Sequence, residues 1–192
     1  MQRNMLWAGS ASIALVALAA AAWFVMQKPA LHGAAIDPPW RAADIRLQDA
    51  NGREFALSGQ RGKLVLLYFG YTNCPNECPL TMAHVKLALD RLGAQAADVR
   101  VVMVTTDPKR DSPEALRAFL GKFGPDFTGL LGSPEQLAKV WSDYGVTVED
   151  GGETHSFFLY VIDRNGNIRE TFLPDSAPAD IADDLEMLAA ER

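Results

Sequence analysis

The sequence has little cysteine, a deficit of positive charge and no internal repeat. Only two of its 192 residues are cysteines, and its 18 lysines and arginines are outnumbered by 24 aspartates and glutamates. This excess of negative charge argues against nucleic acid as a partner, because binding to phosphates requires a basic surface. Apart from an alanine-rich N-terminal segment there is no low-complexity tract, and the length suits one globular domain after that segment.

Charged residues are also missing from residues 6–26, which are almost wholly apolar. Such a run is long enough to cross the roughly 30 Å hydrocarbon core of a bilayer as a helix. We therefore expect residues 1–27 to form an N-terminal transmembrane helix that anchors the chain. A signal peptide cleaved after Ala-Leu-Ala at residues 17–19 is the alternative, but the apolar run continues past that site to Met26. The segment has no cysteine to carry a lipid.

The remaining chain divides into a linker and a domain. Residues 28–40 contain prolines without an amphipathic period and predict a tether, which is followed by a globular domain over residues 41–192. Asn51-Gly52 lies between two short apolar segments and predicts a β-hairpin at the start of this domain. The uninterrupted apolar run at residues 64–69 predicts a buried central strand.

Prolines and serines indicate where several helices begin, because proline suits the first turn of a helix and serine caps it. Helices are expected from Pro79 to Leu92, from Asp111, from Ser133 and from Pro178 to Ala190, and strands over residues 99–104, 157–163 and 168–172. This order of elements predicts an α/β fold with a mixed sheet covered by helices on both faces.

The two cysteines, Cys74 and Cys78, lie four residues apart where the buried strand is followed by the first of these helices. Residues at this spacing can point the same way, and the positive end of a helix dipole lowers the pKa of a thiol and so favours the thiolate. Two thiolates can share one soft cation; copper(I) suits them best, whereas zinc prefers four ligands. A structural disulfide is the alternative, but so short a ring would add little stability.

Around these cysteines the sequence resembles the Sco/SenC family, whose thioredoxin-like copper proteins serve cytochrome c oxidase assembly. The resemblance covers nearly all of the chain after the expected tether and depends on five motifs in order: Gly70-Tyr71-Thr72, Cys74-Pro75-x-x-Cys78-Pro79, residues 106–111 (Thr-Asp-Pro-Lys-Arg-Asp), residues 129–132 (Gly-Leu-Leu-Gly) and His155-Ser156. Asn73 and Asn76 depart from the family pattern, which has an aromatic or imidazole side chain and an acidic residue there. The resemblance implies that Cys74, Cys78 and His155 bind copper, as Cu(I) and as Cu(II).

The other candidate residues have alternative interpretations. His155 follows a pair of glycines and precedes a strand whose start is expected to face the cysteine loop; a histidine without a metal is the alternative. The resemblance places Asp107 near the site, where it would support a ligand or dock a partner, although capping the turn at Pro108 is an equal alternative. Two further histidines are expected to face solvent and two methionines to lie in the core: His32 and His84, and Met82 and Met103.

The resemblance implies a metallochaperone rather than an enzyme: a protein that assists assembly of the CuA centre of cytochrome c oxidase, with Cys74 and Cys78 cycling between dithiol and disulfide. The implied partners are the CuA-bearing oxidase subunit, a copper donor protein and a thiol reductant protein. An alternative is a membrane-anchored thiol-disulfide oxidoreductase that reduces the copper-ligand cysteines of that subunit. Against it are the extra residue relative to Cys-x-x-Cys and the absence of a proline just before Phe157, where thioredoxins hold a cis-proline. A peroxidase of the peroxiredoxin or glutathione peroxidase type shares the fold but needs a different motif around its cysteine.

A CuA domain lies outside the cytoplasm, so the copper interpretation implies that the two thiols face an oxidising compartment. The sequence shows no arginine- and serine-rich presequence of the mitochondrial kind. We therefore expect a single-pass protein of the bacterial inner membrane with its soluble domain in the periplasm.

Overall fold

A computed structural model describes residues 30–149 and 154–191 of the chain. The expected membrane anchor, residues 1–27, lies outside the described residues. Within the described ranges, no helix is both long and apolar enough to cross a membrane.

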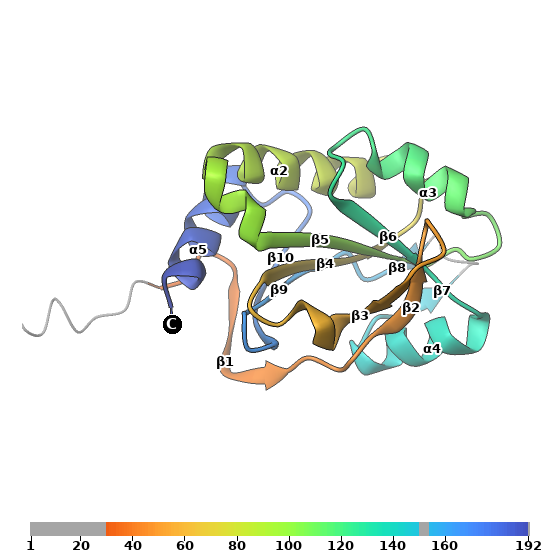
Figure 1. Cartoon of the computed structure of the whole chain (residues 1–192), viewed down its shortest axis with the longest axis horizontal. Helices are drawn as coiled ribbons and strands as arrows, with labels where there is room; N and C mark the ends of the chain where they lie inside the picture. The colour runs from red at the N-terminus through yellow and green to blue at the C-terminus, as the bar shows by residue number, and fades with distance from the viewer. Residues whose placement is uncertain (1–29, 150–153, 192) are drawn as a thin grey trace, which may run out of the picture. The chain divides into compact units, whose positions relative to one another are not determined.

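Strands alternate with helices in the middle of the described part of the chain, and consecutive strands precede and follow this middle part (Figure 1). The strands are β1 (Ala34–Arg41), β2 (Arg46–Asp49), β3 (Glu54–Ala56), β4 (Leu64–Gly70), β5 (Val99–Thr105), β6 (Phe127–Leu131), β7 (Val148–Glu149), β8 (Thr154–His155), β9 (Leu159–Ile162) and β10 (Asn167–Phe172). The helices are α2 (Glu77–Leu92), α3 (Pro113–Leu120), α4 (Pro134–Asp143) and α5 (Pro178–Ala190), with short 3-10 helices at Leu57–Gln60 and Gly93–Asp98.

The main sheet is mixed and has the strand order β1-β10-β9-β4-β5-β6-β2-β3, while β7 and β8 pair separately. Strand β4 lies in the middle, parallel to β5 and antiparallel to β9, and every one of its residues is buried. Successive side chains of a strand point to opposite faces, so a strand covered on both sides needs an uninterrupted apolar run. The prediction of a buried central strand at residues 64–69 is confirmed.

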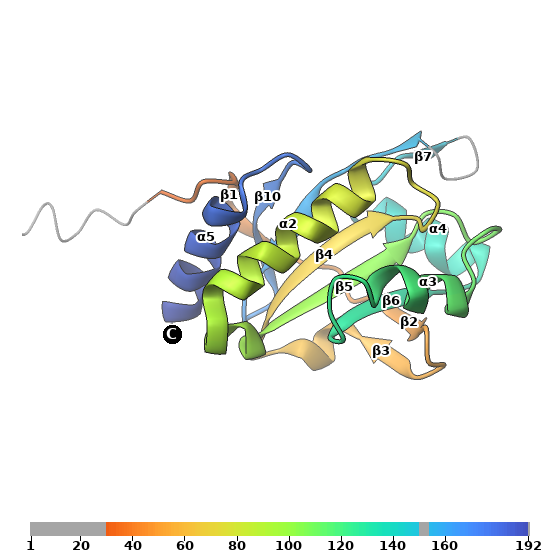
Figure 2. The same ribbon diagram turned by 90° about the horizontal axis from the view of Figure 1, so that it is seen from above.

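Helices cover both faces of this sheet, as the sequence predicts. On one face α2, α3 and α5 contribute residues such as Met82 and Leu116 to a core with Leu66 of β4, and Figure 2 shows α2 crossing that face. On the other face α4 contributes Leu137 to a core with Leu67. Full burial of each such side chain contributes roughly 1.5–3 kcal/mol to folding, so alternate residues of β4 stabilise the two layers independently.

The N-terminal hairpin consists of β2 and β3, in agreement with the Asn-Gly signal. Asp49 Oδ1 accepts hydrogen bonds from the backbone N–H groups of Asn51 at 2.8 Å and Arg53 at 2.9 Å. Gly52 has a φ of +77°, a conformation that glycine adopts without steric cost. Strand β2 also pairs with β6 and so joins the hairpin to the main sheet.

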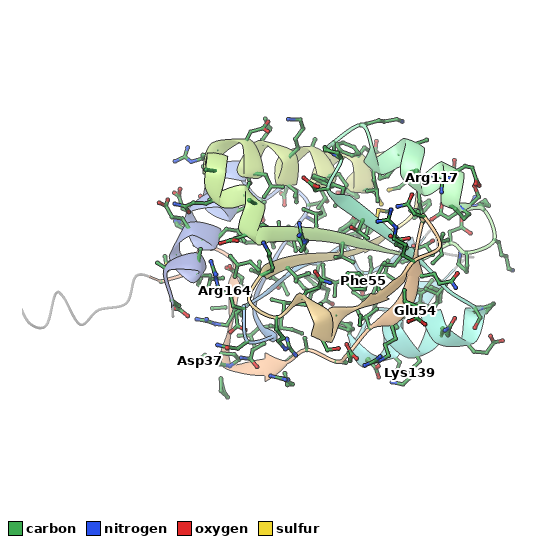
Figure 3. The ribbon with its side chains drawn as sticks, in the orientation of Figure 1. Asp37, Glu54, Phe55, Arg117, Lys139 and Arg164 are labelled. Atoms are coloured by element: carbon green, nitrogen blue, oxygen red, sulfur yellow. The ribbon has the colours of Figure 1, made fainter. Side chains whose placement is uncertain are left out.

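Sequence patterns do not predict strand β6, which pairs in parallel with β5. A Cβ atom at Gly129 of β6 would lie 3.0 Å from Leu120 Cδ1 and 3.2 Å from Leu116 Cβ, so the glycine lets α3 pack closely on this strand. Arg117 of the same helix, labelled in Figure 3, donates a hydrogen bond to the backbone carbonyl of Ala50 beside the hairpin turn. Strand β6 is therefore held by its pairing with β5 and β2 and by the close packing of α3.

Strand β1 is also absent from the sequence-based prediction. It pairs antiparallel with β10, so residues 34–40 of the expected tether lie in the sheet, and the compact unit begins at Leu31. Just before β1, the backbone N–H of His32 donates to Asp184 Oδ2 at 2.7 Å and its ring Nδ1 lies 2.7 Å from Asp184 Oδ1. His32 was expected to face solvent, but its ring is half-exposed and bound to α5.

The two carboxyl groups that hold this N-terminal segment are fully buried. Glu170 of β10 and Asp184 of α5 both accept a hydrogen bond from Gly33 N–H, each at 3.1 Å. Burial, together with a hydrogen bond to Asp184, raises the pKa of Glu170 to about 9. Glu170 therefore keeps its proton at neutral pH.

Candidate metal centre

The candidate site lies at the carboxyl end of β4. The strand ends at Gly70, whose carbonyl accepts a hydrogen bond at 2.9 Å from Thr106 N–H, just after the parallel strand β5. Helix α2 begins at Glu77, earlier than the Pro79 expected from the sequence, so Cys78 lies in its first turn. The end of a central strand and the start of the next helix thus hold the two cysteines.

Cys74 takes the position of a helix-capping group. The N-cap residue of α2, Asn76, makes no side-chain capping bond, and instead Cys78 N–H donates to Cys74 Sγ at 3.3 Å. The first N–H groups of a helix have no partner within the helix, and a negatively charged acceptor is favoured there. Both thiols are free and buried, Cys74 with 8 % of its surface exposed and Cys78 with none.

The two thiols have opposite affinities for a proton. A hydrogen bond from the Cys78 thiol lowers the pKa of Cys74 to about 5, assisted by the backbone N–H groups of residues 76–78 and opposed by burial. The same hydrogen bond, followed by burial, raises the pKa of Cys78. At neutral pH Cys74 is therefore the thiolate and Cys78 holds the proton. The expectation of two thiolates is correct for Cys74 and wrong for Cys78, because Cys78 is more deeply buried and donates the hydrogen bond between the two sulfurs.

A tyrosine and a glycine of β4 surround Cys78. Tyr68 Oη donates a hydrogen bond to Cys78 Sγ at 3.7 Å, a contact that the sequence analysis did not foresee. A Cβ atom at Gly70 would lie 2.9 Å from Cys78 Sγ and 2.6 Å from the Tyr68 ring. The glycine of the Gly-Tyr-Thr motif is therefore required for the close approach of the thiol to the end of β4.

Asp111 holds the cysteine loop against β5. Its Oδ1 accepts hydrogen bonds from Thr72 N–H at 3.0 Å and from Thr72 Oγ1 at 2.6 Å, while its Oδ2 accepts from Thr105 Oγ1 at 2.5 Å. The sequence predicts Asp111 at a helix start, but Ser112 is the residue that caps α3. An acidic residue just before the capping serine, close to the end of a strand parallel to β4, is the signal that could have indicated this role, because parallel strands end at the same edge of a sheet.

Asp107, the candidate for supporting a ligand or docking a partner, is buried in the turn after β5. Its carbonyl accepts hydrogen bonds from the N–H groups of Arg110 and Asp111, and its carboxylate pairs with the Arg110 side chain. Arg110 in turn lies over the ring of Tyr71, 5.9 Å from its centre. Asp107 therefore stabilises the turn, and it reaches the cysteine loop through Arg110.

The backbone of His155 is described but its side chain is not. His155 pairs with Val148 in the small sheet of β7 and β8. Leu159, the first residue of β9, lies opposite Tyr68 of β4. The segment that joins β8 to β9 therefore ends beside the carboxyl end of β4. Figures 1 and 2 show β7 and β8 at the same end of the molecule as the start of α2. The role of His155 as a third ligand stays a prediction; among the described side chains, no group of three histidine, cysteine or acidic residues could hold a metal.

The remaining candidates are two methionines and a histidine. Met82 and Met103 are fully buried in the core, as expected. His84, expected to face solvent, is half-buried, and its Nδ1 lies 3.0 Å from the carbonyl of Ser176. It therefore links α2 to the loop before α5.

A mixed sheet of this order, with two thiols where its central strand is followed by a helix, defines a thioredoxin-like dithiol protein. A sequence model of the SCO1/SenC family matches residues 35–190. The chain belongs to this family, in agreement with the resemblance of its motifs.

Individual relatives support the same assignment. A SCO2-like protein of Rickettsia felis is 35 % identical over 152 residues, which cover 74 % of each chain. The structure of Bradyrhizobium japonicum ScoI with copper bound matches with a TM-score of 0.71 and 30 % identity, covering 77 % of this chain and 99 % of that one. The structure of yeast Sco1 with copper bound matches with a TM-score of 0.71 and 27 % identity, covering 80 % and 91 % of the two chains.

Proposed function

We propose that this protein binds one copper ion through Cys74, Cys78 and His155 and assists assembly of the CuA centre of cytochrome c oxidase. The observation that carries the proposal is the pair of buried sulfurs joined at the start of α2, one of them a thiolate at neutral pH. Copper is bound in the related structures of ScoI and yeast Sco1, and the Sco family is one of cytochrome c oxidase assembly proteins.

The donor set fits copper. Thiolates are soft ligands that suit Cu(I), and an imidazole from His155 would add a harder donor suited to Cu(II). Burial of Cys74 and Cys78 keeps water from competing, and the helix start favours the negative charge that the ligands carry. As an assembly factor the protein would need a copper donor, a thiol reductant for Cys74 and Cys78, and the CuA-bearing subunit as acceptor.

Copper binding by residues 31–192, the compact unit, tests this proposal. We expect the reduced protein to bind one equivalent of copper and to show a thiolate-to-copper(II) absorption band. Cys74→Ser, Cys78→Ser and His155→Ala should each lose the band, because each removes a ligand, whereas His84→Ala should keep it as the matched control. Retention of the band and of affinity in His155→Ala would show that the histidine is not a ligand.

A second candidate function, disulfide reduction, is favoured by the different environments of the two thiols. The partly accessible Cys74 thiolate can attack a target disulfide, which forms a mixed disulfide and releases one target thiol. The buried Cys78 can then attack Cys74, which releases the second target thiol and leaves the protein oxidised until a thiol reductant restores it. The Cys78→Ser variant should trap the mixed disulfide if this function is correct. If it does so and the wild-type protein binds no copper, disulfide reduction replaces the copper proposal.

We also propose that residues 1–27 anchor the protein in a bacterial inner membrane, with the domain in the periplasm. The support is the uncharged run at residues 6–26 and the oxidising compartment that a CuA partner implies. In a bacterial host, the full chain should stay with the membrane after alkaline extraction, and protease added to spheroplasts should digest its domain. Release of a shorter, processed chain into the periplasm would show a cleaved signal peptide instead.

A further inference from the structure

The environment of Tyr68 distinguishes this tyrosine from an ordinary core residue. It lies in the middle of β4 with no exposed surface, and its neighbours in the adjacent strands are the buried residues Leu159 and Met103. Its hydroxyl donates to Cys78 Sγ at 3.7 Å, within the range of a hydrogen bond to sulfur. A phenol in an apolar layer needs a partner for its hydroxyl, and here a cysteine of the proposed site provides it.

The packing keeps the tyrosine ring and the thiol together. Gly70 has no side chain, and this leaves room for both the Tyr68 ring and Cys78 Sγ. A Cβ atom at this position would lie only 2.6 Å from the ring and 2.9 Å from the sulfur. Cys78 is held from the other side by the first turn of α2, where its N–H donates to Cys74 Sγ. The packing therefore keeps the hydroxyl oxygen of Tyr68 close to the sulfur.

A hydrogen bond to sulfur depends on the charge of the sulfur. A thiol that donates to a neighbouring thiolate gains negative charge on its sulfur and accepts better than a disulfide sulfur, which carries no such charge. Oxidation of the pair by a small disulfide forms the Cys74–Cys78 bond and transfers two electrons and two protons to the oxidant, which becomes two thiols. A donor fixed beside Cys78 stabilises the reactant of this oxidation more than its product.

We propose that Tyr68 is a positioning residue for the cysteine pair, whose hydroxyl holds Cys78 Sγ and favours the reduced dithiol over the disulfide. The inference rests on the proposed function of Cys74 and Cys78 as the copper-binding, redox-active pair. The reduced pair is also the form that can bind copper, so Tyr68 favours the state that is ready to load. When copper is bound, the same hydrogen bond withdraws charge from one of its sulfur ligands.

The substitution Tyr68→Phe in the full chain removes the hydroxyl and keeps the ring. The matched control is Tyr160→Phe, which removes a buried hydroxyl that donates to the carbonyl of Tyr144 at 3.0 Å on the opposite face of the sheet. The metal-free proteins are equilibrated with mixtures of glutathione and glutathione disulfide, and the fraction with free thiols is counted by alkylation and mass spectrometry. Tyr68→Phe should shift the equilibrium toward the disulfide by about 3- to 10-fold, the effect of one hydrogen bond between neutral groups, and Tyr160→Phe by less than about twofold.

Copper provides a second readout that a purely structural role would not change. In the copper(II)-loaded protein, Tyr68→Phe should move the thiolate-to-copper band to longer wavelength, because the sulfur lone pairs rise in energy when the hydrogen bond is lost. An unchanged glutathione equilibrium in Tyr68→Phe, or an equal shift in both variants, would overturn the inference. A wild-type protein that binds no copper would instead overturn the proposed function, and the metal-free equilibrium would still decide the role of Tyr68.

Discussion

At the scale of the residue, the uneven sharing of one proton distinguishes Cys74 from Cys78. The thiol of Cys78 and the N–H groups of the first turn of α2 all point their hydrogens at Cys74 Sγ. Residues four apart at a helix start are enough to predict a lowered pKa, but which sulfur holds the proton depends on burial and on the direction of the hydrogen bond between them.

The pH dependence of alkylation tests this difference. Because only the thiolate reacts, the rate of Cys74 alkylation by iodoacetamide should rise with a midpoint near pH 5 and be level by pH 7. In Cys78→Ala the midpoint should move upward, since the largest stabilising hydrogen bond is lost and only the backbone donors remain. Peptide mass spectrometry would follow both rates between pH 4 and pH 9; a wild-type midpoint above pH 8 would refute the assignment.

The stability of the domain should depend on Asp111, because its carboxylate accepts three hydrogen bonds from Thr72 and Thr105. Asp111→Asn keeps the size but turns an amide N–H₂ group toward these donors, and it should cost about 1.5–3 kcal/mol of unfolding free energy. The control Asp90→Asn changes an exposed aspartate that pairs with Lys86, and it should cost no more than about 0.5 kcal/mol. Urea unfolding measures both; equal costs would mean that Asp111 does not hold the loop.

At the scale of the element, the segment from Leu31 through β1 is tied to β10 and α5. Gly33 bonds to both buried carboxyl groups, and β1 covers an edge of the sheet that β10 would otherwise expose. A tether without these contacts is what the local sequence predicts, because prolines and alanines have neither an amphipathic period nor a turn signal. The contacts join residues that are far apart in the chain, and they decide the boundary of the domain.

Truncation tests whether β1 belongs to the domain. A chain that begins at Ala42 lacks the N–H groups that donate hydrogen bonds to Glu170 and Asp184. Its free energy of unfolding should be lower than that of a chain that begins at Leu31 by at least about 3 kcal/mol. Urea unfolding of the two chains gives the difference. Equal stability would restore the interpretation of residues 28–40 as a tether.

The buried carboxyl pair makes the stability depend on pH. The folded-state pKa of Glu170 is raised to about 9, so the folded chain holds a proton that the unfolded chain releases above its ordinary pKa of about 4.5. The stabilisation is therefore complete below about pH 4.5 and is lost as the pH rises toward 9, by up to about 1.4 kcal/mol per pH unit. Urea unfolding at pH 5, 7 and 9 should show this decline in the wild type.

Glu170→Gln is the control for this decline, because its amide can donate to Asp184 at any pH and accept from Gly33. Its stability should match the wild type near pH 5 and exceed it near pH 9. The pKa of His32 is also raised by its hydrogen bond to Asp184, which adds a decline of the same sign above its ordinary pKa of 6.5 in both proteins. If the free energy of unfolding declined with pH equally in the two proteins, groups other than Glu170 would cause the decline.

At the scale of the whole molecule, the proposed ligands come from separate parts of the fold. Cys74 and Cys78 lie between β4 and α2, whereas His155 lies in β8, which precedes β9. A metal held by all three would join these parts in the folded chain and would find no such arrangement in the unfolded chain. Copper binding should therefore stabilise the whole domain.

Thermal unfolding with and without copper measures this coupling. At a free copper(I) concentration of 100 times the dissociation constant, the stabilisation should be about 2.7 kcal/mol, and the unfolding temperature should rise. A copper(I) chelator should reverse the rise, and Cys74→Ser should show none. A rise of equal size in His155→Ala would indicate that the two cysteines alone hold the metal.

Local patterns in the sequence determined several strands, turns and helix starts of this protein. The uninterrupted apolar run of β4, the Asn-Gly turn and the prolines at the starts of α3, α4 and α5 each act over a few residues, and each predicts its element correctly. The spacing of Cys74 and Cys78 at a strand–helix junction likewise predicts two neighbouring thiols and the lowered pKa of Cys74. These features follow from propensity, capping and turn geometry, which neighbouring residues control.

Only the tertiary structure decided the rest, because it depends on which distant residues become neighbours. Strand β6 forms where α3 packs on Gly129, and β1 forms where β10 and α5 offer partners. Asp111 reaches Thr72 from 39 residues away, and Tyr68 meets Cys78 because a strand and the helix after it fold back on one another. Local patterns do not specify the partners in such contacts, since the geometry of the sheet and its helices brings the two residues together only when the chain folds.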